Sequence, residues 1–366
     1  MGSGTIPSKK LECPQPSQPL RTINKNLQIW ESELASDPDR EFLLHGLNNG
    51  FPLVDTDPLL IKNSVSKNHK SALDKSDRVE KRLLEEIEDG NYIVTNPSAV
   101  TLVSPLAAIE KPDGDVRLIH DLSHPLGSSL NDYATKEECQ YESLQDALDS
   151  LSPNMYMAKC DLKWAYRSVP IRPDHSPLTG LQWTFKGDNS PTTLMDTTLC
   201  FGARKSPAHF NRVTKSIKRM MVRRGFNCSV FLDDFLLYED TMEQCAAALT
   251  TLIALLRSLG FRINWKKVVD PCQRLVFLGI EIDTVNNKLS LDPDKATQLI
   301  STLDQTTSKK RLSKKQLQKL AGKLNWACNV FTWGRAFMNT FFQAICQLNA
   351  ADHRMRITTS MLSDIR

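Results

Sequence analysis

The sequence predicts an α+β fold in which a split β-α-β sheet is followed by a helical C-terminal part. Two observations carry this prediction. Short β-rich runs alternate with amphipathic helical stretches in the order α-β-β and then β-α-β-β-α-β, which is the order of ferredoxin-like sheets. After about residue 284, the apolar residues recur mainly at helical spacing. With 366 residues, the chain is long enough for two or three subdomains.

The first part of the chain predicts a lead-in segment and a docking region. Residues 1 to about 28 are rich in Pro, Ser and Lys and have no apolar period, so we expect them to be disordered. Short apolar clusters between Trp30 and about Leu60 are expected to pack on the body of the protein. A polar, basic stretch at 62–75 is expected to contain a domain boundary.

The elements of the central part follow from local signals. A helix is expected from Ser76 to Gly90, and the β-rich runs 104–109 and 116–119 enclose an Asp-Gly turn that predicts a hairpin. A strand over 155–159 leads into Asp161, and a helix starts near Ser206-Pro207. Two apolar strands, 228–232 and 235–238, are joined by Asp233-Asp234. Capping pairs predict helices after Ser143, Thr241 and Ser313.

Composition and charge bound the class of protein. A net charge of +4 is too small to indicate a partner by itself, because nucleic-acid contact needs a local cationic face. The nine cysteines are scattered without a C-x-x-C pair, which fits neither a disulfide framework nor a zinc site. No signal peptide and no membrane-spanning apolar run is present. We therefore expect an intracellular protein, cytoplasmic or nuclear and not secreted, with no membrane partner.

The pair Asp233-Asp234 between hydrophobic strands is the most specific feature. Two carboxylates are a poor choice for a tight turn, and adjacent like charges raise each other's pKa unless a cation neutralises them. A hard divalent cation with oxygen ligands is the natural neutraliser. Asp161 is expected to reach the same sheet edge, so that three carboxylates converge. A solvated polar turn at Asp233-Asp234 and a helix N-cap at Asp161 are the structural alternatives.

Six ordered motifs, spread over about residues 76–347, resemble those of reverse transcriptases. Asp161 is followed five residues on by Tyr166, the position of the family's aromatic gate, and Phe231 to Asp234 resembles its [YF]-x-D-D hairpin. The other motifs are the fingers signature at Lys111, Asp113, Gly114, Arg117 and Asp121; the nucleotide-pocket segment Phe201-Gly202 leading to Ser206-Pro207; the lysine motif Gly260 to Lys267; and the primer-grip hairpin Phe277-Leu278-Gly279. Phe231 replaces the more usual Tyr, and Ser123 stands where a second fingers arginine is common.

The resemblance implies a right-hand polymerase fold and an RNA-directed DNA polymerase. It implies two Mg²⁺ ions, with Mn²⁺ as an alternative, a primed RNA or DNA template and dNTP substrates. The implied residues fall into three sets: catalytic Asp161, Asp233 and Asp234, with Leu162 as a further metal-binding position; nucleotide-binding Lys111, Arg117, Tyr166, Phe201, Gly202 and Lys267; and nucleic-acid-binding Phe277, Leu278, Gly279, Lys314, Lys315, Lys319 and Lys323.

The same resemblance gives expected domain bounds: an N-terminal extension at 1–75, fingers at 76–135, a palm at 136–283 with a fingers insertion at about 168–205, and a thumb with the start of a connection at 284–366. Segments such as Leu320 to Trp326 are most similar to retrotransposons that use a tyrosine recombinase, the DIRS type. Because members of the family normally continue into an RNase H domain, for which this chain has no room, the sequence predicts a fragment or truncated copy.

Thr307 to Lys323 carries seven Lys or Arg and no acid. Lys314 and Lys315 fall in a helix's first turn, where the helix dipole disfavours cations, so this segment is expected to track phosphates rather than to be only a solvated face. Trp326, Trp333 and Phe337 are expected in the core, and His120, His124 and His209 are expected to be structural. The rival functions are an inactive nucleic-acid-binding relic and an RNA-dependent RNA polymerase or nucleotide cyclase.

Overall fold

The computed structural model describes residues 22–111 and 114–365, which form two compact units. The first unit contains the residues up to 141 together with 160–235 and 250–267, and the second contains 142–159, 236–249 and the residues from 268 onward. Strands β6 (Tyr156–Lys163) and β10 (Asp234–Glu239) and helix α7 (Met242–Ser258) contribute residues to both units. Within the described residues, no helix has the length and apolar character needed to cross a membrane.

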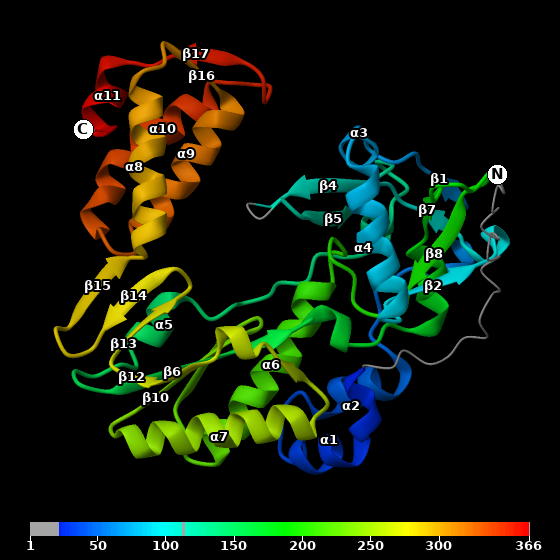
Figure 1. Ribbon diagram of the computed structural model, residues 1–366, viewed down its shortest axis with the longest axis horizontal. Coiled ribbons are helices and arrows are strands. Elements are labelled where there is room, and N and C mark those ends of the chain that lie inside the picture. The colour runs from blue at the N-terminus through cyan, green and yellow to red at the C-terminus, as the bar shows by residue number, and fades with distance from the viewer. Residues whose placement is uncertain (1–21, 112–113, 366) are drawn as a thin grey trace, which may run out of the picture. The chain divides into compact units, whose positions relative to one another are not determined.

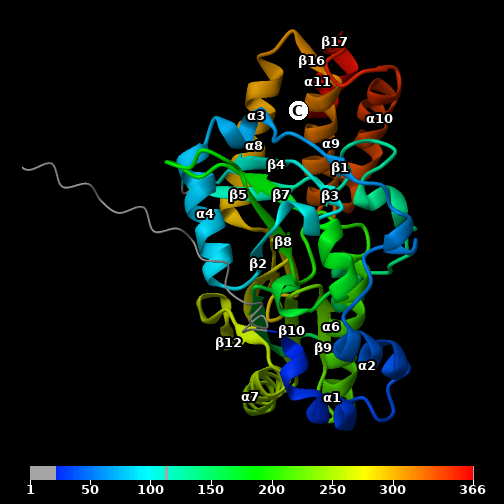
Figure 2. The same ribbon diagram turned by 90° about the vertical axis from the view of Figure 1, so that its right-hand side faces the viewer.

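Residues 23–28 lie in helices, so the expectation of disorder to about residue 28 was wrong for them, whereas residues 1–21 lie outside the described residues. The short 3-10 helix Ile23–Asn26 precedes α1 (Leu27–Glu33) and α2 (Arg40–Asn49). Trp30 is fully buried, and its indole Nε1 donates to the carbonyl of Leu259 at 3.1 Å. Figures 1 and 2 show α1 and α2 beside α6 (Ser206–Arg223), where Arg219 pairs with Asp37 at 2.7 Å. The predicted docking on the body is confirmed.

The part of the first unit between residues 64 and 196 combines helices with small sheets. The expected hairpin is present as β4 (Leu106–Glu110) and β5 (Val116–His120), with Ala108 opposite Leu118. Figure 2 shows α4 (Ser76–Glu88) beside β4 and β5. The apolar face of α4 shares one buried cluster with them and with β2 (Tyr92–Thr95), β7 (Leu181–Trp183) and β8 (Thr192–Asp196). The remaining elements are β1 (Ser64–Val65), α3 (Lys70–Leu73) and β3 (Leu102–Val103).

The sheet that carries Asp161 has the strand order β11-β6-β10-β9, with β9 at Cys228–Phe231 and β11 at Arg262–Ile263. Together with α6 and α7, these strands follow the chain order β6-α6-β9-β10-α7-β11, which is the split β-α-β arrangement that the sequence predicts. Helix α7 begins as expected, because Thr241 Oγ1 accepts from the backbone N–H of Gln244 at 3.2 Å. Gly260, with φ +95°, follows its end.

The second unit contains a three-stranded antiparallel sheet and a helical part. Its strands β13, β14 and β15 pair in that order, and a buried cluster built on Leu317, Leu320 and Phe341 holds the helices together. The region after residue 284 is not all helix, because β16 pairs with β17. The elements are α5 (Leu144–Leu148), β12 (Val269–Cys272), β13 (Arg274–Phe277), β14 (Ile280–Asp283), β15 (Lys288–Leu291), α8 (Pro293–Thr307), β16 (Arg311–Ser313), α9 (Lys314–Ala327), α10 (Met338–Cys346), β17 (Arg354–Arg356) and α11 (Thr359–Ile365).

Candidate active site

The turn between β9 and β10 consists of Leu232 and Asp233, and Asp234 is already the first residue of β10. The turn therefore begins one residue earlier than the Asp233-Asp234 turn that the sequence predicted. Leu232 takes φ +55°, a left-handed conformation that is costly for a residue with a branched side chain. This geometry explains why two carboxylates are compatible with a tight turn here, because the positive φ angle falls on the residue before them.

Asp161 lies inside strand β6 and not at a helix start, so its N-cap alternative is excluded. Its side chain is 2% exposed and both of its oxygens are bonded. Oδ1 accepts from Asn264 Nδ2 at 2.8 Å, and Oδ2 accepts from Lys267 Nζ at 2.8 Å. The backbone N–H of Leu162 donates to the carbonyl of Asp233 at 3.2 Å, so β6 lies directly beside the carboxylate turn.

The electrostatics connect Asp161 with Asp233, and all three acids with Lys267. Burial, and next the charge of Asp161, raise the pKa of Asp233 above its ordinary value. The hydrogen bond to Asp161 raises the pKa of Lys267, and the charges of Asp161, Asp234 and Asp233 act in the same direction. The turn is therefore a site of excess negative charge, which Lys267 only partly neutralises. We call Asp161, Asp233, Asp234, Asn264 and Lys267 the carboxylate centre.

The donor set of the carboxylate centre fits a divalent cation in its chemistry, since carboxylate oxygens are the ligands that Mg²⁺ prefers. In residues 22–111 and 114–365, however, no three His, Cys, Asp or Glu side chains are arranged as a ready-made metal site. The physical reason lies in Asp161, whose two oxygens are directed to Asn264 and Lys267. The Lys267 ammonium therefore occupies a position at Asp161 Oδ2 that a cation would also approach.

Two aromatic rings expected in the nucleotide pocket lie against each other. The Tyr166 ring stacks on Phe201 with 4.9 Å between centroids and 28° between planes, and its edge meets Phe210 at 5.0 Å. Burial raises the pKa of the Tyr166 hydroxyl. Gly202 is required where it stands, because its φ is +104° and an added Cβ would lie 2.5 Å from the carbonyl oxygen of His120.

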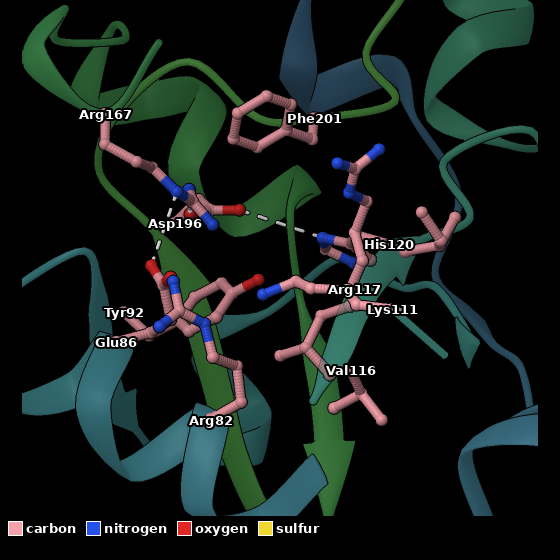
Figure 3. Close-up of a pocket in the computed structure, with 12 residues that line it drawn as sticks. Arg82, Glu86, Tyr92, Lys111, Val116, Arg117, His120, Arg167, Asp196 and Phe201 are labelled. Carbon is pink, nitrogen blue, oxygen red and sulfur yellow. Dashed lines mark hydrogen bonds and ion pairs between the residues drawn. The ribbon is translucent and has the colours of Figure 1, made fainter. Parts of the chain in front are cut away.

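Lys111 and Arg117 line one cavity of about 560 Å³ in the first unit. Figure 3 shows Lys111 directed toward Arg82, whereas the Arg117 side chain is directed away from Arg82, on the side of Phe201. Lys111 Nζ pairs with Asp115 at 2.8 Å, so this cation already has an internal partner that an anionic ligand must displace. The structure thus brings together two residues expected to bind the triphosphate and adds Arg82, for which the sequence gave no signal.

Another wall of this cavity holds buried charges that the sequence did not indicate. Arg167 pairs closely with Asp196, and its Nε lies 3.5 Å from Glu86 (Figure 3). His120 is buried, and its Nε2 lies 3.2 Å from the carbonyl oxygen of Gly180, which fits the expected structural role. Its Nδ1 is 3.7 Å from Asp196 Oδ2. The buried charge of Arg167 is offset by Glu86 of α4 and by Asp196 of β8, so Arg167 links these two elements.

The predicted nucleic-acid contacts of the second unit divide into exposed and internal residues. The ring of Phe277 is 1% exposed, whereas Leu278 and Gly279 form the β13–β14 turn with φ +49° and +84°. In α9, Lys315 and Lys319 are exposed, but Lys314 Nζ donates to the carbonyl of Leu348 at 2.6 Å. Lys323 Nζ likewise bonds Thr302 Oγ1 at 2.8 Å.

The expectation that Trp333 and Phe337 belong to the core was wrong. Their exposed fractions are 82% and 53%. Trp326 is partly buried, and its Nε1 lies 3.4 Å from the carbonyl oxygen of Leu278. The expected role of His209 fits, since it is buried and its Nε2 lies 2.7 Å from the carbonyl oxygen of Pro52. Asp113 of the expected fingers signature lies outside the described residues.

Comparisons with known proteins place this geometry in context. Residues 109–282 match the family model described as reverse transcriptase (RNA-dependent DNA polymerase). The chain is 24% identical over 204 residues to a genome polyprotein of Petunia vein clearing virus, covering 54% of this chain and 8% of that protein. It is 24% identical over 241 residues to a retrovirus-related Pol polyprotein from transposon opus of Drosophila melanogaster, covering 64% and 22%. The chain thus spans less than a quarter of the length of either relative.

Among solved structures, the chain is similar to the foamy viral protease-reverse transcriptase in complex with RNA/DNA hybrid. The TM-score is 0.64 at 17% identity, and the match covers 95% of this chain and 47% of that one. At this identity the likeness concerns the fold. The expected α+β, right-hand polymerase fold is confirmed.

Proposed function

We propose that this chain is the core of an RNA-directed DNA polymerase. Its residues 109–282 form a reverse transcriptase domain of the retroelement and retroviral type. As a nucleotidyltransferase, it adds deoxynucleotides to a primer 3′-hydroxyl. The carboxylate centre supports this most directly: Asp161, held by Asn264 and Lys267, stands beside the strained turn that carries Asp233. A merely solvated polar turn does not account for the burial that raises the pKa of Asp233.

In the proposed reaction, the primer 3′-oxygen attacks the α-phosphorus of a dNTP and loses its proton. The bond from this phosphorus to the bridging oxygen breaks, and pyrophosphate leaves with the electron pair. Two Mg²⁺ ions, or Mn²⁺ in their place, would supply activation of the hydroxyl and neutralisation of the leaving group. Asp161, Asp233 and Asp234 would hold them, with Leu162 as a further ligand position, and Lys267 would stay near the phosphates as the fixed cation.

The cavity lined by Lys111, Arg117 and Arg82, which we call the fingers cavity, supplies the proposed nucleotide contacts. Lys111 and Arg117 line the same cavity, so both cations can meet one triphosphate, with Lys111 leaving Asp115 to do so. Tyr166, stacked on Phe201, presents a ring that can clash with a ribose 2′-hydroxyl, and Gly202 permits close backbone approach.

The finer assignments are part of the same proposal. We assign fingers to 76–135 and about 168–205, the rest of 136–283 to the palm, and 284–366 to the thumb and the start of a connection. A primed RNA or DNA template would meet Leu278, Lys315 and Lys319, which are not buried, and would approach the turn in which Gly279 is buried. This agrees with the RNA/DNA hybrid named for the foamy viral protein. The proposal also includes membership of the DIRS-type retrotransposons and an intracellular location.

The test is primer extension on an RNA template with a DNA primer, comparing wild type with Asp233→Asn. We expect incorporation to fall at least about a hundredfold, because the variant removes a negative charge from the proposed metal ligands while keeping the size of the side chain. Asp240→Asn is the matched control, since Asp240 is exposed just beyond β10, and it should stay within about twofold of wild type. Equal incorporation by wild type and Asp233→Asn would refute the proposal.

One observation favours a second candidate, an inactive nucleic-acid-binding relic. Lys267 binds Asp161 Oδ2 directly, at an oxygen that a metal ion would need. This candidate predicts salt-sensitive duplex binding, no extension, and a melting temperature that Mg²⁺ does not change. A polymerase predicts a melting temperature that rises with Mg²⁺ in wild type but not in Asp233→Asn.

A further inference from the structure

A second hollow, of about 380 Å³, lies at the edge strand β11, and it shares no lining residue with the fingers cavity. Its lining is formed by Lys163, Arg257, Phe261, Arg262, Ile263 and Trp265. The three cations among these residues are exposed. None of them forms an ion pair within the part of the chain that the structure describes. Three positive charges therefore gather in one hollow without a negative partner.

Strand register places two of these cations on the face of the sheet that carries Asp161. Lys163 is two residues beyond Asp161 in β6, and successive side chains of a strand alternate between faces. Arg262 is the direct partner of Lys163 across the β6–β11 pair, so its side chain shares that face. The intervening pair, Leu162 and Ile263, is buried.

Aromatic contacts hold the two cations together despite their like charge. Lys163 Nζ lies 4.0 Å from the centroid of the Trp164 ring, and Arg262 Cζ lies 5.1 Å from the same centroid. Trp164 adopts φ +58°, an uncommon conformation for a bulky residue, and its ring lies within cation–π distance of both cations. Beside them, Trp265 is 62% exposed. The chain thus maintains a concentrated positive charge at a place where acids would be the ordinary partners.

We propose that this hollow binds a small polyphosphate anion, and that its source is the pyrophosphate released at the carboxylate centre. The inference rests on the proposed polymerase function, because that reaction supplies pyrophosphate next to Asp161. A compact anion fits better than a nucleic-acid strand, since the cations converge on one hollow instead of forming a line along the surface. The site would draw the product away from the carboxylates and hold it near the sheet edge.

The experiment is a calorimetric titration of the whole chain with sodium pyrophosphate at low salt, without divalent metal. We expect wild type to bind, and Arg262→Ala and Lys163→Ala each to bind about tenfold more weakly, which is the effect of about one charge-assisted hydrogen bond. Lys266→Ala is the matched control: it removes the same charge from the neighbouring turn but lies outside the hollow. It should stay within about twofold of wild type. Thermal melting checks that each variant is folded. If Arg262→Ala does not fold, Arg262→Lys replaces it in the titration.

Several results would overturn the proposal. One is an absence of pyrophosphate binding by wild type, and another is an equal loss of pyrophosphate affinity in Lys266→Ala and Arg262→Ala. A third is a loss of oligonucleotide binding in Arg262→Ala while its pyrophosphate binding is retained. A parallel titration with dNTP separates the two sources of polyphosphate, because dependence on Arg262 for dNTP alone would assign the hollow to the substrate. The titration needs no catalysis, so a chain that binds pyrophosphate through Arg262 but never extends a primer would refute the polymerase and leave the anion site standing.

Discussion

The carboxylate centre and helix α9 differ in how the chain uses its charged side chains. Among the three acids, Asp161 is bonded at both oxygens by Asn264 and Lys267, and strand β6 fixes it beside the turn. In α9, Lys314 and Lys323 bond other parts of the second unit, while Lys315 and Lys319 remain exposed. A strand register determines where a charge must lie, whereas a run of lysines on a helix leaves their partners to the surrounding fold.

The largest expected effect on activity is that of replacing Tyr166, which lies just beyond strand β6, the strand that carries Asp161 of the carboxylate centre. Its ring is held by Phe201 and Phe210, so we expect it to act as a rigid wall against a ribose 2′-hydroxyl. Tyr166→Ala should raise ribonucleotide relative to deoxynucleotide incorporation by about a hundredfold. Single-nucleotide extension with dNTP and rNTP measures the ratio.

Tyr166→Phe is the control, because it keeps the ring and removes only the hydroxyl, and it should retain the wild-type preference. An unchanged preference in Tyr166→Ala would show that the aromatic stack only packs the core. An enzyme that uses ribonucleotides before any substitution would favour the RNA-dependent RNA polymerase alternative.

The sequence predicted the positions best where backbone geometry restricts the choice of residue. The β-α-β-β-α-β order, the β4–β5 hairpin and the Ser313–Gln316 capping box all follow from local patterns, and the structure contains them. The turn was misplaced by one residue because Leu232 carries the positive φ angle, which no composition rule assigns to leucine. Asn264 and the Arg167–Asp196 pair were missed because their partners are far apart in sequence. Arg82 was missed because Lys111 and Arg117, which line the same cavity, are distant from it in sequence.

The same limit explains the errors in the C-terminal part. Lys315, Lys319 and Lys323 share the i, i+4 spacing of one helix face, yet Lys323 bonds Thr302 of α8. Trp333 and Phe337 are exposed although their apolar character predicts burial. Helical spacing says which residues share a face, but it does not say what covers that face.

A smaller effect is expected on stability at the carboxylate centre. The raised pKa of Asp233 means that its ionised form is disfavoured in the folded chain. The resulting destabilisation is absent below the unfolded pKa, near 3.8, and is fully present once the pH exceeds the folded pKa. Asp233→Asn should therefore melt about 1–3 °C above wild type at pH 7 without metal, with a gap that narrows as the pH falls toward 4.

Differential scanning calorimetry at several pH values, with and without Mg²⁺, measures this gap. Added Mg²⁺ should close it at pH 7 by stabilising wild type alone. A variant that melts below wild type at pH 7 without metal would show that the charge of Asp233 is already compensated within the protein, and the case for a cation at this turn would fail.

The smallest effect separates the two kinds of lysine in α9. Because Lys315 and Lys319 are exposed, replacing either by Ala should weaken binding to a primer–template duplex a few-fold and reduce the slope of log affinity against log salt by about 0.9. Lys314→Ala and Lys323→Ala remove bonds to Leu348 and Thr302, so they should lower the melting temperature and leave the slope unchanged. Fluorescence anisotropy across a salt series gives the slopes. If all four variants lower the slope equally, the internal bonds of Lys314 and Lys323 yield to phosphate on binding, and α9 uses its lysines as one set despite their different partners in the free protein.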